Sequence, residues 1–207
     1  SILDSLLNTV EEIGLTKVGN EKILLLRTYG TATLLDYIND EKVSTEEYSG
    51  NEIWELKSNN KIFKPLEPII GEASFTYSSI IENTFLFSTS KSGLESLLSK
   101  YKSGDTFDKT SLYRTAENKL TSASSIITIS NLKGTIDILE ETVSKSLSKA
   151  FDKSKLNDYV FGSQFIVDDG FYHSNFLIKK ITEEDEQNTV TSAFNVQFNT
   201  DLAILPQ

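Results

Sequence analysis

The chain has 207 residues, and its 20 Lys and Arg against 30 Asp and Glu give a formal net charge of −10. Such an acidic surface repels phosphate backbones, so we expect no nucleic-acid partner. The sequence has no Cys and one His, which excludes disulfides, thiolate ligands and intrachain metal sites built from several histidines.

The first third of the chain mixes helical and strand patterns. Apolar residues at helical spacing predict a helix over residues 3–13, which Gly14 ends. A compact apolar run predicts a buried strand over 22–29, and a short helix over 31–38 follows. Two hairpins are then expected, one joining 43–48 to 52–57 and one joining 73–81 to 84–88.

The middle of the chain predicts three helices and one strand. Ser92 and Glu95 fit a capping box at the start of the first helix, and Asp108 is the expected N-cap of a second helix over 109–121. A short strand is expected over 125–130. The third helix, over 132–150, has the longest apolar stripe, formed by Leu132, Ile136, Leu139, Val143, Leu147 and Phe151.

The C-terminal part predicts a meander of three strands, over 159–167, 171–181 and 190–199. Asp169-Gly170 is a strong signal for a two-residue hairpin turn. That turn pairs Ile166 with His173. It also places on one buried face the side chains of Phe161, Phe165, Phe176 and Ile178, joined from the third strand by Phe194, Val196 and Phe198.

These elements predict an α+β fold, with antiparallel sheets, a C-terminal three-stranded meander and about four to five helices packed on one side. The strands and helices do not alternate, which argues against a Rossmann or barrel layout. No apolar run is long enough to cross a bilayer, so we expect a soluble module. We expect residues 1–207 to form a single module excised from a longer chain, and the alternative is two lobes, about 1–130 and 131–207.

Few residues suggest catalysis. His173 is the only imidazole base, and no Gly-x-Ser-x-Gly motif supplies a nucleophile for it, so we interpret it as a structural or exposed residue. Trp54, Tyr48 and Tyr29 could line a sugar or peptide surface, but aromatic residues at strand spacing belong more often to a core.

Neighbouring carboxylates are common in the chain, at Glu46/Glu47, Glu140/Glu141, Asp168/Asp169 and Glu183 to Glu186. Adjacent residues on a strand point to opposite faces, whereas a glycosidase needs two carboxyls that face each other across a cleft. We therefore interpret these pairs as solvated turns and helix faces. Neither a calcium-loop motif nor a glycine-rich phosphate loop is present in the sequence. We predict no catalytic, cofactor-binding or metal-binding residues, and no cofactor.

Three short motifs resemble a known family. They are the run Glu-Tyr-Ser-Gly-Asn-Glu-Ile-Trp over 47–54, the apolar strand that ends in Ser-Thr-Ser over 85–90, and the Leu-rich helix over 93–101. The pattern is similar to that of an uncharacterised domain-of-unknown-function family of envelope-associated bacterial proteins, and the likeness extends loosely through 108–131 into the C-terminal strands. It implies an exported or membrane-anchored parent, such as a periplasmic protein or lipoprotein, in which the α+β module precedes repeat or propeller-like regions. It implies no activity and no catalytic residues.

Two classes of function remain open. The first is a non-catalytic envelope or extracytoplasmic module that contacts an envelope protein, a glycan or adjacent domains of the parent chain. The alternative is a hydrolase that uses Asp and Glu carboxylates only. A deep cleft with two facing carboxyls would favour the hydrolase, and a shallow apolar groove or an exposed sheet edge would favour the interaction module.

Overall fold

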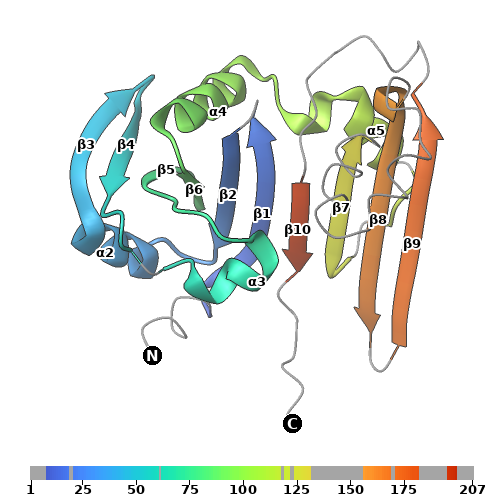
Figure 1. The fold of residues 1–207 in the computed structure, drawn as a ribbon, viewed down its shortest axis with the longest axis horizontal. Coiled ribbons are helices and arrows are strands. Elements are labelled where there is room, and N and C mark those ends of the chain that lie inside the picture. Colours follow the sequence, from blue (N-terminus) through green and yellow to red (C-terminus); the bar gives the residue numbers. More distant parts are fainter. Residues whose placement is uncertain are drawn as a thin grey trace. The chain divides into compact units, whose positions relative to one another are not determined.

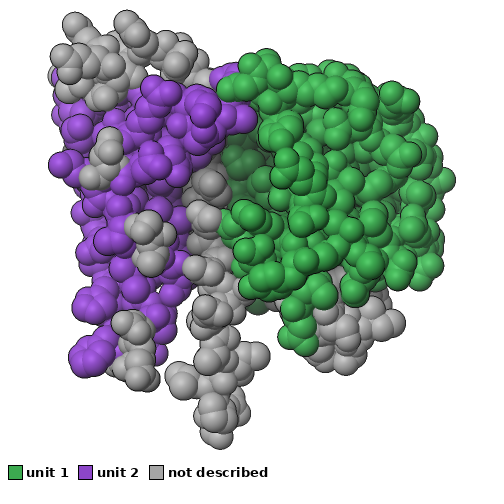
Figure 2. All heavy atoms as spheres, turned by 180° about the vertical axis from the view of Figure 1, so that it is seen from behind, with its two compact units in different colours: residues 1–104 green, residues 105–207 purple. Residues whose placement is uncertain are grey.

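The computed structural model describes residues 8–18, 21–60, 62–117, 119–121, 124–131, 156–168, 171–181 and 195–199. The chain divides into two compact units, residues 1–104 and 105–207, which are coloured separately in Figure 2. The expectation that the chain acts as a single module stays a prediction.

The first unit contains a six-stranded antiparallel sheet in the order β3-β4-β5-β6-β2-β1 (Figure 1). The strands are β1 (Val10–Val18), β2 (Glu21–Thr28), β3 (Lys42–Tyr48), β4 (Asn51–Leu56), β5 (Tyr77–Ile81) and β6 (Thr84–Ser88). The helices are α2 (Ala32–Glu41), the single turn α3 (Glu67–Ile70) and α4 (Lys91–Ser103), and a short 3-10 turn, η1 (Lys64–Leu66), precedes α3.

Both predicted hairpins of this unit are confirmed. The β3–β4 turn places Ser49 at φ 57° and Gly50 at φ 77°, with Tyr48 paired to Asn51. Positive φ at both central residues is what a type I′ turn requires, and its twist matches that of the flanking strands. In the β5–β6 turn, which joins Ile81 to Thr84, Glu82 also has a positive φ of 52°.

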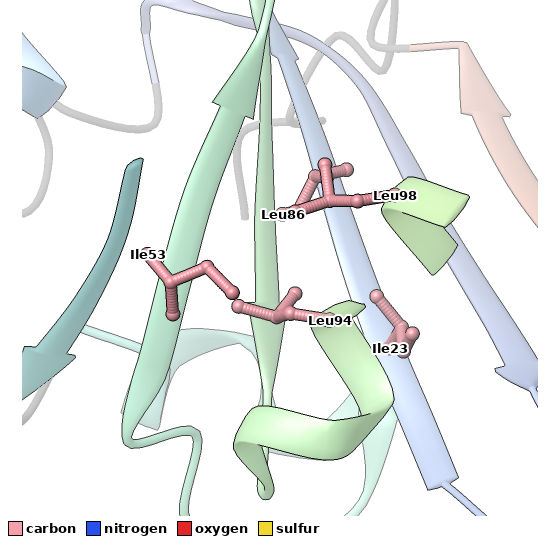
Figure 3. Close-up of a cluster of buried hydrophobic side chains, with 5 residues drawn as sticks. All are labelled: Ile23, Ile53, Leu86, Leu94 and Leu98. Atoms are coloured by element: carbon pink, nitrogen blue, oxygen red, sulfur yellow. The ribbon is translucent and has the colours of Figure 1, made fainter. Parts of the chain in front are cut away.

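One face of this sheet packs against α4. Leu94 and Leu98 of the helix meet Ile23, Ile53 and Leu86 of three strands, and all five side chains are at most 2% exposed. Figure 3 shows the two leucines directed at the strand residues. Residues three and four apart share a face of a helix, so the Leu94–Leu98 spacing supplies the buried stripe.

The opposite face of the same sheet is also covered. Phe85 and Phe87 of β6 point away from α4, since they alternate with Leu86. The ring of Phe63, just before η1, packs edge-on against Phe87 and Phe75 with centroid distances of 4.7 and 5.0 Å. Side chains are therefore buried against both faces of the sheet, and the expectation that the helices pack on one side stays a prediction.

The predicted helix over residues 3–13 is wrong for residues 10–13, which belong to β1, and residues 3–7 lie outside the described residues. A bulge explains the misleading spacing. The register shifts between Val10 and Glu12, so Val10 pairs with Thr28 and Ile13 with Leu26. Val10 and Ile13 thus share one buried face although they are three residues apart, as on a helix.

Two helix starts also differ from the prediction. Ser90, and not Ser92, is the N-cap of α4, and its hydroxyl accepts a hydrogen bond from the Gly93 N–H at 3.1 Å. Asp108 lies in a 3-10 turn, η2 (Phe107–Lys109), before the shorter helix α5 (Ser111–Glu117). The hydroxyl of Thr110 accepts from the Tyr113 N–H there, at 3.1 Å.

The second unit has an antiparallel sheet in the order β10-β7-β8-β9. Its strands are β7 (Ile126–Asn131), β8 (Tyr159–Asp168), β9 (Phe171–Lys180) and β10 (Asn195–Asn199), and a 3-10 turn, η3 (Leu156–Asp158), precedes β8. The expected meander is wrong in its last strand, because β10 pairs with β7 and not with β9. The connection over 182–194 is longer than a hairpin loop, which frees β10 to pair elsewhere.

The α+β class is confirmed, with antiparallel sheets in both units. The predicted number of helices is wrong. Four to five helices were expected, and within the described residues three helices exceed a single turn, namely α2, α4 and α5. One expected helix is a strand in its described part, and the expected helix over 132–150 lies outside the described residues.

Candidate interaction surface

Helix α5 covers one face of the second unit's sheet. Leu112 and Ala116 of the helix pack against Ile129 of β7 and Val160 of β8, and all four are buried. Gln164 of β8 points to the same face, because it alternates in step with Val160. Its side chain is 0% exposed and holds Thr121 on both sides, with the amide nitrogen donating to the Thr121 carbonyl at 2.7 Å and the amide oxygen accepting from the Thr121 N–H at 3.2 Å.

The other face of β8 and β9 presents apolar side chains to solvent. The register pairs Phe165 with Ser174 and Ser163 with Phe176, so these residues share a face that alternates with the α5 side. We call the exposed apolar members of this set the open face. They are Phe165 at 41% exposure, Val167 at 46%, Tyr172 at 73%, Phe176 at 66% and Ile178 at 61%.

The open face is ordered by its own contacts. The rings of Phe165 and Phe176 lie edge to face with their centroids 6.0 Å apart. Val167 stands directly opposite Tyr172 across the two strands. Aromatic and β-branched pairs of this kind stabilise a hairpin from one side, so the strands do not need a second layer to hold their register.

The predicted register of this hairpin is confirmed and the predicted burial is wrong. Asp168 pairs with Phe171 and Ile166 with His173, as a two-residue turn requires. Phe165 and Phe176 do share a face, but that face is exposed. Alternation in the sequence shows which residues face the same way and does not show whether another layer covers them. The side chains of Phe194, Val196 and Phe198 lie outside the described residues.

The single histidine lies on the other face of this sheet. His173 is exposed and lies on the α5 side of β9, opposite Ile166. Within the described parts of the chain, no cluster of three or more His, Cys, Asp or Glu could hold a metal ion. His173 therefore brings no chemistry to the open face, since it points to the other side of the sheet.

The described carboxylate pair Glu46/Glu47 does not form a facing pair. Glu46 and Glu47 are neighbours on β3 and point to opposite faces of the sheet. Glu46 forms an ion pair with Lys91 at the start of α4. Glu47 stands opposite Glu52, which accepts a hydrogen bond from the Trp54 indole at 2.7 Å. The pairs at 140–141 and 183–186 lie outside the described residues.

Glu12 of β1 is a carboxyl whose pKa is raised. Partial burial raises the pKa of Glu12 above its ordinary value, the neighbouring Arg27 opposes that shift and Glu11 adds to it. Glu11 itself pairs with Arg27 at 3.3 Å. The local charges thus come from one guanidinium and one further carboxylate at the bulge of β1.

The three aromatic residues considered for a ligand surface have different surroundings. Trp54 is 6% exposed and belongs to the core. The Tyr48 hydroxyl is within hydrogen-bonding distance of the Ser99 hydroxyl of α4, at 2.9 Å. Tyr29 is 72% exposed, at the end of β2. They do not form one surface. The alternating pattern did place Phe165, Phe176 and Ile178 of the open face together, but it predicted that face as buried.

Searches against protein-family models, curated proteins and solved structures found no match. None of the helices in the described part of the chain has the length and apolar character needed to cross a membrane.

Proposed function

We propose that this chain is a non-catalytic interaction module that binds an apolar protein surface through its open face. The observation that carries the proposal is the exposure of Phe165, Val167, Tyr172, Phe176 and Ile178 on one side of a single hairpin. Scattered exposed apolar residues are ordinary, but a contiguous group of them marks a surface that another molecule covers. Aromatic residues are also enriched at the centre of protein interfaces.

The chemistry of the open face favours a protein over a glycan. On the same side of β9, Ser174 and Lys180 are the polar residues, and the other residues are the apolar members of the open face. A sugar needs several placed polar groups beside an aromatic ring, whereas a protein hot spot needs apolar anchors with few charges at the centre. We propose an adjacent domain of the parent chain as the partner, in the cell envelope and outside the cytoplasm, as the resemblance of residues 47–54, 85–90 and 93–101 implies.

A photocrosslinking amino acid at a single position tests this proposal in the parent protein in its own cells. Position 176 on the open face and position 43 on β3 are matched, because Phe176 and Val43 are 66% and 63% exposed. We expect position 176 to form one discrete crosslink within the parent chain and position 43 to form none. A crosslink to glycan, or equal patterns from both positions, would contradict the proposal.

The envelope location is tested separately by protease treatment of intact and permeabilised cells. We expect the chain to show the same pattern of protease sensitivity as known extracytoplasmic proteins, both in intact and in permeabilised cells. Co-fractionation with cytosolic enzymes would contradict this location without bearing on the interaction surface.

The alternative function, a hydrolase that uses carboxylates only, has one observation in its favour. Carboxyls with a raised pKa are enriched at catalytic sites, and burial raises the pKa of Glu12. If the chain hydrolyses a substrate through this group, Glu12→Gln must abolish turnover without lowering the melting temperature. If turnover survives Glu12→Gln, Glu12 is not the catalytic carboxylate of such a hydrolase.

A further inference from the structure

Strand β9 is exposed along its whole length. Among the described strands it pairs with β8 alone, and it ends the sheet of its unit. Eight of its ten residues are exposed on both faces of the sheet, and the remaining two, Leu177 and Lys179, are half-buried. In the described part of the chain, no strand pairs with the backbone hydrogen-bonding groups on the outer side of β9, so these groups can pair with another strand.

Nothing in β9 discourages such pairing between Phe171 and Ile178. This stretch contains no proline and no Asp, Glu, Lys or Arg, and its pairing with β8 runs from Tyr159–Lys180 to Asp168–Phe171 without a bulge. Proteins usually protect an edge strand by charges, prolines, bulges or short length. A straight, apolar edge of this length is a template for strand addition.

The edge strand of the first unit provides the contrast. Strand β3 ends that sheet, and it has a register shift between Lys42 and Ser44 as well as the charged pair Glu46 and Glu47. These are the protective devices that β9 lacks. The same chain therefore guards one sheet edge and leaves the other open.

The sequence of β9 is suited to pairing with itself. We propose that β9 pairs antiparallel with β9 of a second copy of this chain, about a two-fold axis at Asn175. Opposite residues in an antiparallel pair share a face, so a two-fold axis perpendicular to the sheet must pass between two copies of the same residue. With Asn175 at the axis, Tyr172 stands opposite Ile178 of the second copy, and the two copies supply this aromatic–aliphatic pair twice.

The charges of β9 are compatible with this register. Lys179 and Lys180, the two lysines of β9, lie at its end. An antiparallel pair about Asn175 keeps the lysines of the two copies at opposite ends of the shared edge, where Lys179 of each copy stands opposite Phe171 of the other. The net charge of −10 opposes association only weakly, because salt screens the repulsion between charges more than about 8 Å apart.

This inference goes beyond the proposed function and does not depend on it. The pairing uses the backbone edge of β9, and the open face remains uncovered. It joins the open faces of two copies into one surface on a continuous sheet. An adjacent domain could then bind a surface of twice the width.

Single cysteines give a sharp test because the chain has none of its own. Asn175→Cys places two cysteines opposite each other at the axis, within the Cβ–Cβ separation of about 3.5–5.5 Å that suits opposed strand residues and disulfides. Ser174→Cys is the matched control, because Ser174 opposes Phe176 of the second copy and its own counterpart lies two residues away, about 6.6 Å along the strand. Val43→Cys controls for chance collision at an exposed site on β3.

We expect the unmodified protein to sediment as a dimer in a concentration-dependent equilibrium. We expect Asn175→Cys to become a disulfide-linked dimer on mild oxidation, and both controls to stay uncrosslinked. A protein that remains monomeric at every concentration, or cysteine variants that crosslink equally, would overturn the proposal. Open-ended assembly would overturn it too, since an isologous pair closes at two copies.

An opposite-charge pair separates this register from other dimers. Tyr172→Lys should weaken the dimer about tenfold at low salt, because a charge then replaces the aromatic partner of Ile178 in the second copy, and adding Ile178→Glu should restore it by placing opposite charges in that pair. If Tyr172→Lys dimerises as the unmodified protein does, or if Ile178→Glu restores nothing, the proposed register is wrong. A photocrosslinker at position 176 stands opposite Ser174 of the second copy, so a crosslink to the second copy reports on the dimer, whereas a crosslink to another part of the parent chain reports on the proposed function. The two proposals therefore fail separately.

Discussion

Replacement of Leu94 by Ala tests how the first unit is held together. Leu94 is 0% exposed and lies between α4 and the sheet, in contact with a cluster that includes Ile23, Ile53 and Leu98. Deleting a buried leucine side chain costs the transfer free energy of the lost atoms and adds the cost of the cavity. A rigid sheet below and a helix above limit collapse of that cavity, so we expect the free energy of unfolding to fall by about 3–5 kcal/mol.

The assay uses the only tryptophan of the chain. Trp54 is buried in β4, so its fluorescence in a urea titration follows the unfolding of the first unit. This choice matters because two compact units need not unfold in one step. Leu97→Ala is the matched control. Leu97 is on the same helix but only partly buried against the cluster, so we expect a clearly smaller loss.

Equal losses in the free energy of unfolding for Leu94→Ala and Leu97→Ala would refute this prediction. A loss below about 1 kcal/mol for Leu94→Ala would also refute it, since that is the range of surface substitutions and small rearrangements. Either result would mean that α4 does not bury the face of the helix that the structure assigns to the core.

Three further predictions concern close packing, a buried amide and pH. Gly93→Ala should lower the free energy of unfolding by about 1–3 kcal/mol, because a Cβ there would meet the Ser88 hydroxyl at 2.6 Å, and a urea titration that shows no loss would contradict it. Gln164→Leu should cost about 1–3 kcal/mol in a thermal melt, because it leaves the Thr121 N–H and carbonyl without their partner; an unchanged melting temperature would show that these groups find other partners. Burial raises the pKa of Glu12, so the folded chain binds the Glu12 proton more tightly than the unfolded chain does. The contribution of Glu12 to the free energy of unfolding is therefore smallest once the pH exceeds the pKa of Glu12 in the folded chain. Glu12→Gln should therefore raise the free energy of unfolding at neutral pH and leave it nearly unchanged at acidic pH, and a gain of equal size at both would contradict the sign.

Most of the fold could be predicted from local strand and turn signals. Both hairpins of the first unit and the register of β8 and β9 followed from apolar runs and from the turns at Ser49-Gly50 and Asp169-Gly170. Turn residues with positive φ fix the register of the strands beside them, so these features are encoded within a few residues. The α+β class followed from the same signals.

The errors come from interactions between distant segments. The bulge that aligns Val10 with Ile13 depends on β2 and imitates a helical spacing. The pairing of β10 with β7 depends on strands about 70 residues apart, whose choice of partner no local pattern encodes. The exposure of Phe176 and Ile178 depends on whether a second layer covers β9, which an alternating pattern does not state.

The central claim is that the apolar side of the β8–β9 hairpin is a surface and not a core. The most direct test measures two properties of Phe176→Ser, its melting temperature and its binding of a hydrophobic dye. Val43→Ser is the control, because Val43 is about equally exposed. We predict that Phe176→Ser lowers the melting temperature much less than Leu94→Ala does and lowers dye binding, whereas Val43→Ser leaves both nearly unchanged. A fall in the melting temperature as large as that of Leu94→Ala, with dye binding unchanged or increased, would show that Phe176 is buried and would contradict the proposed interaction surface.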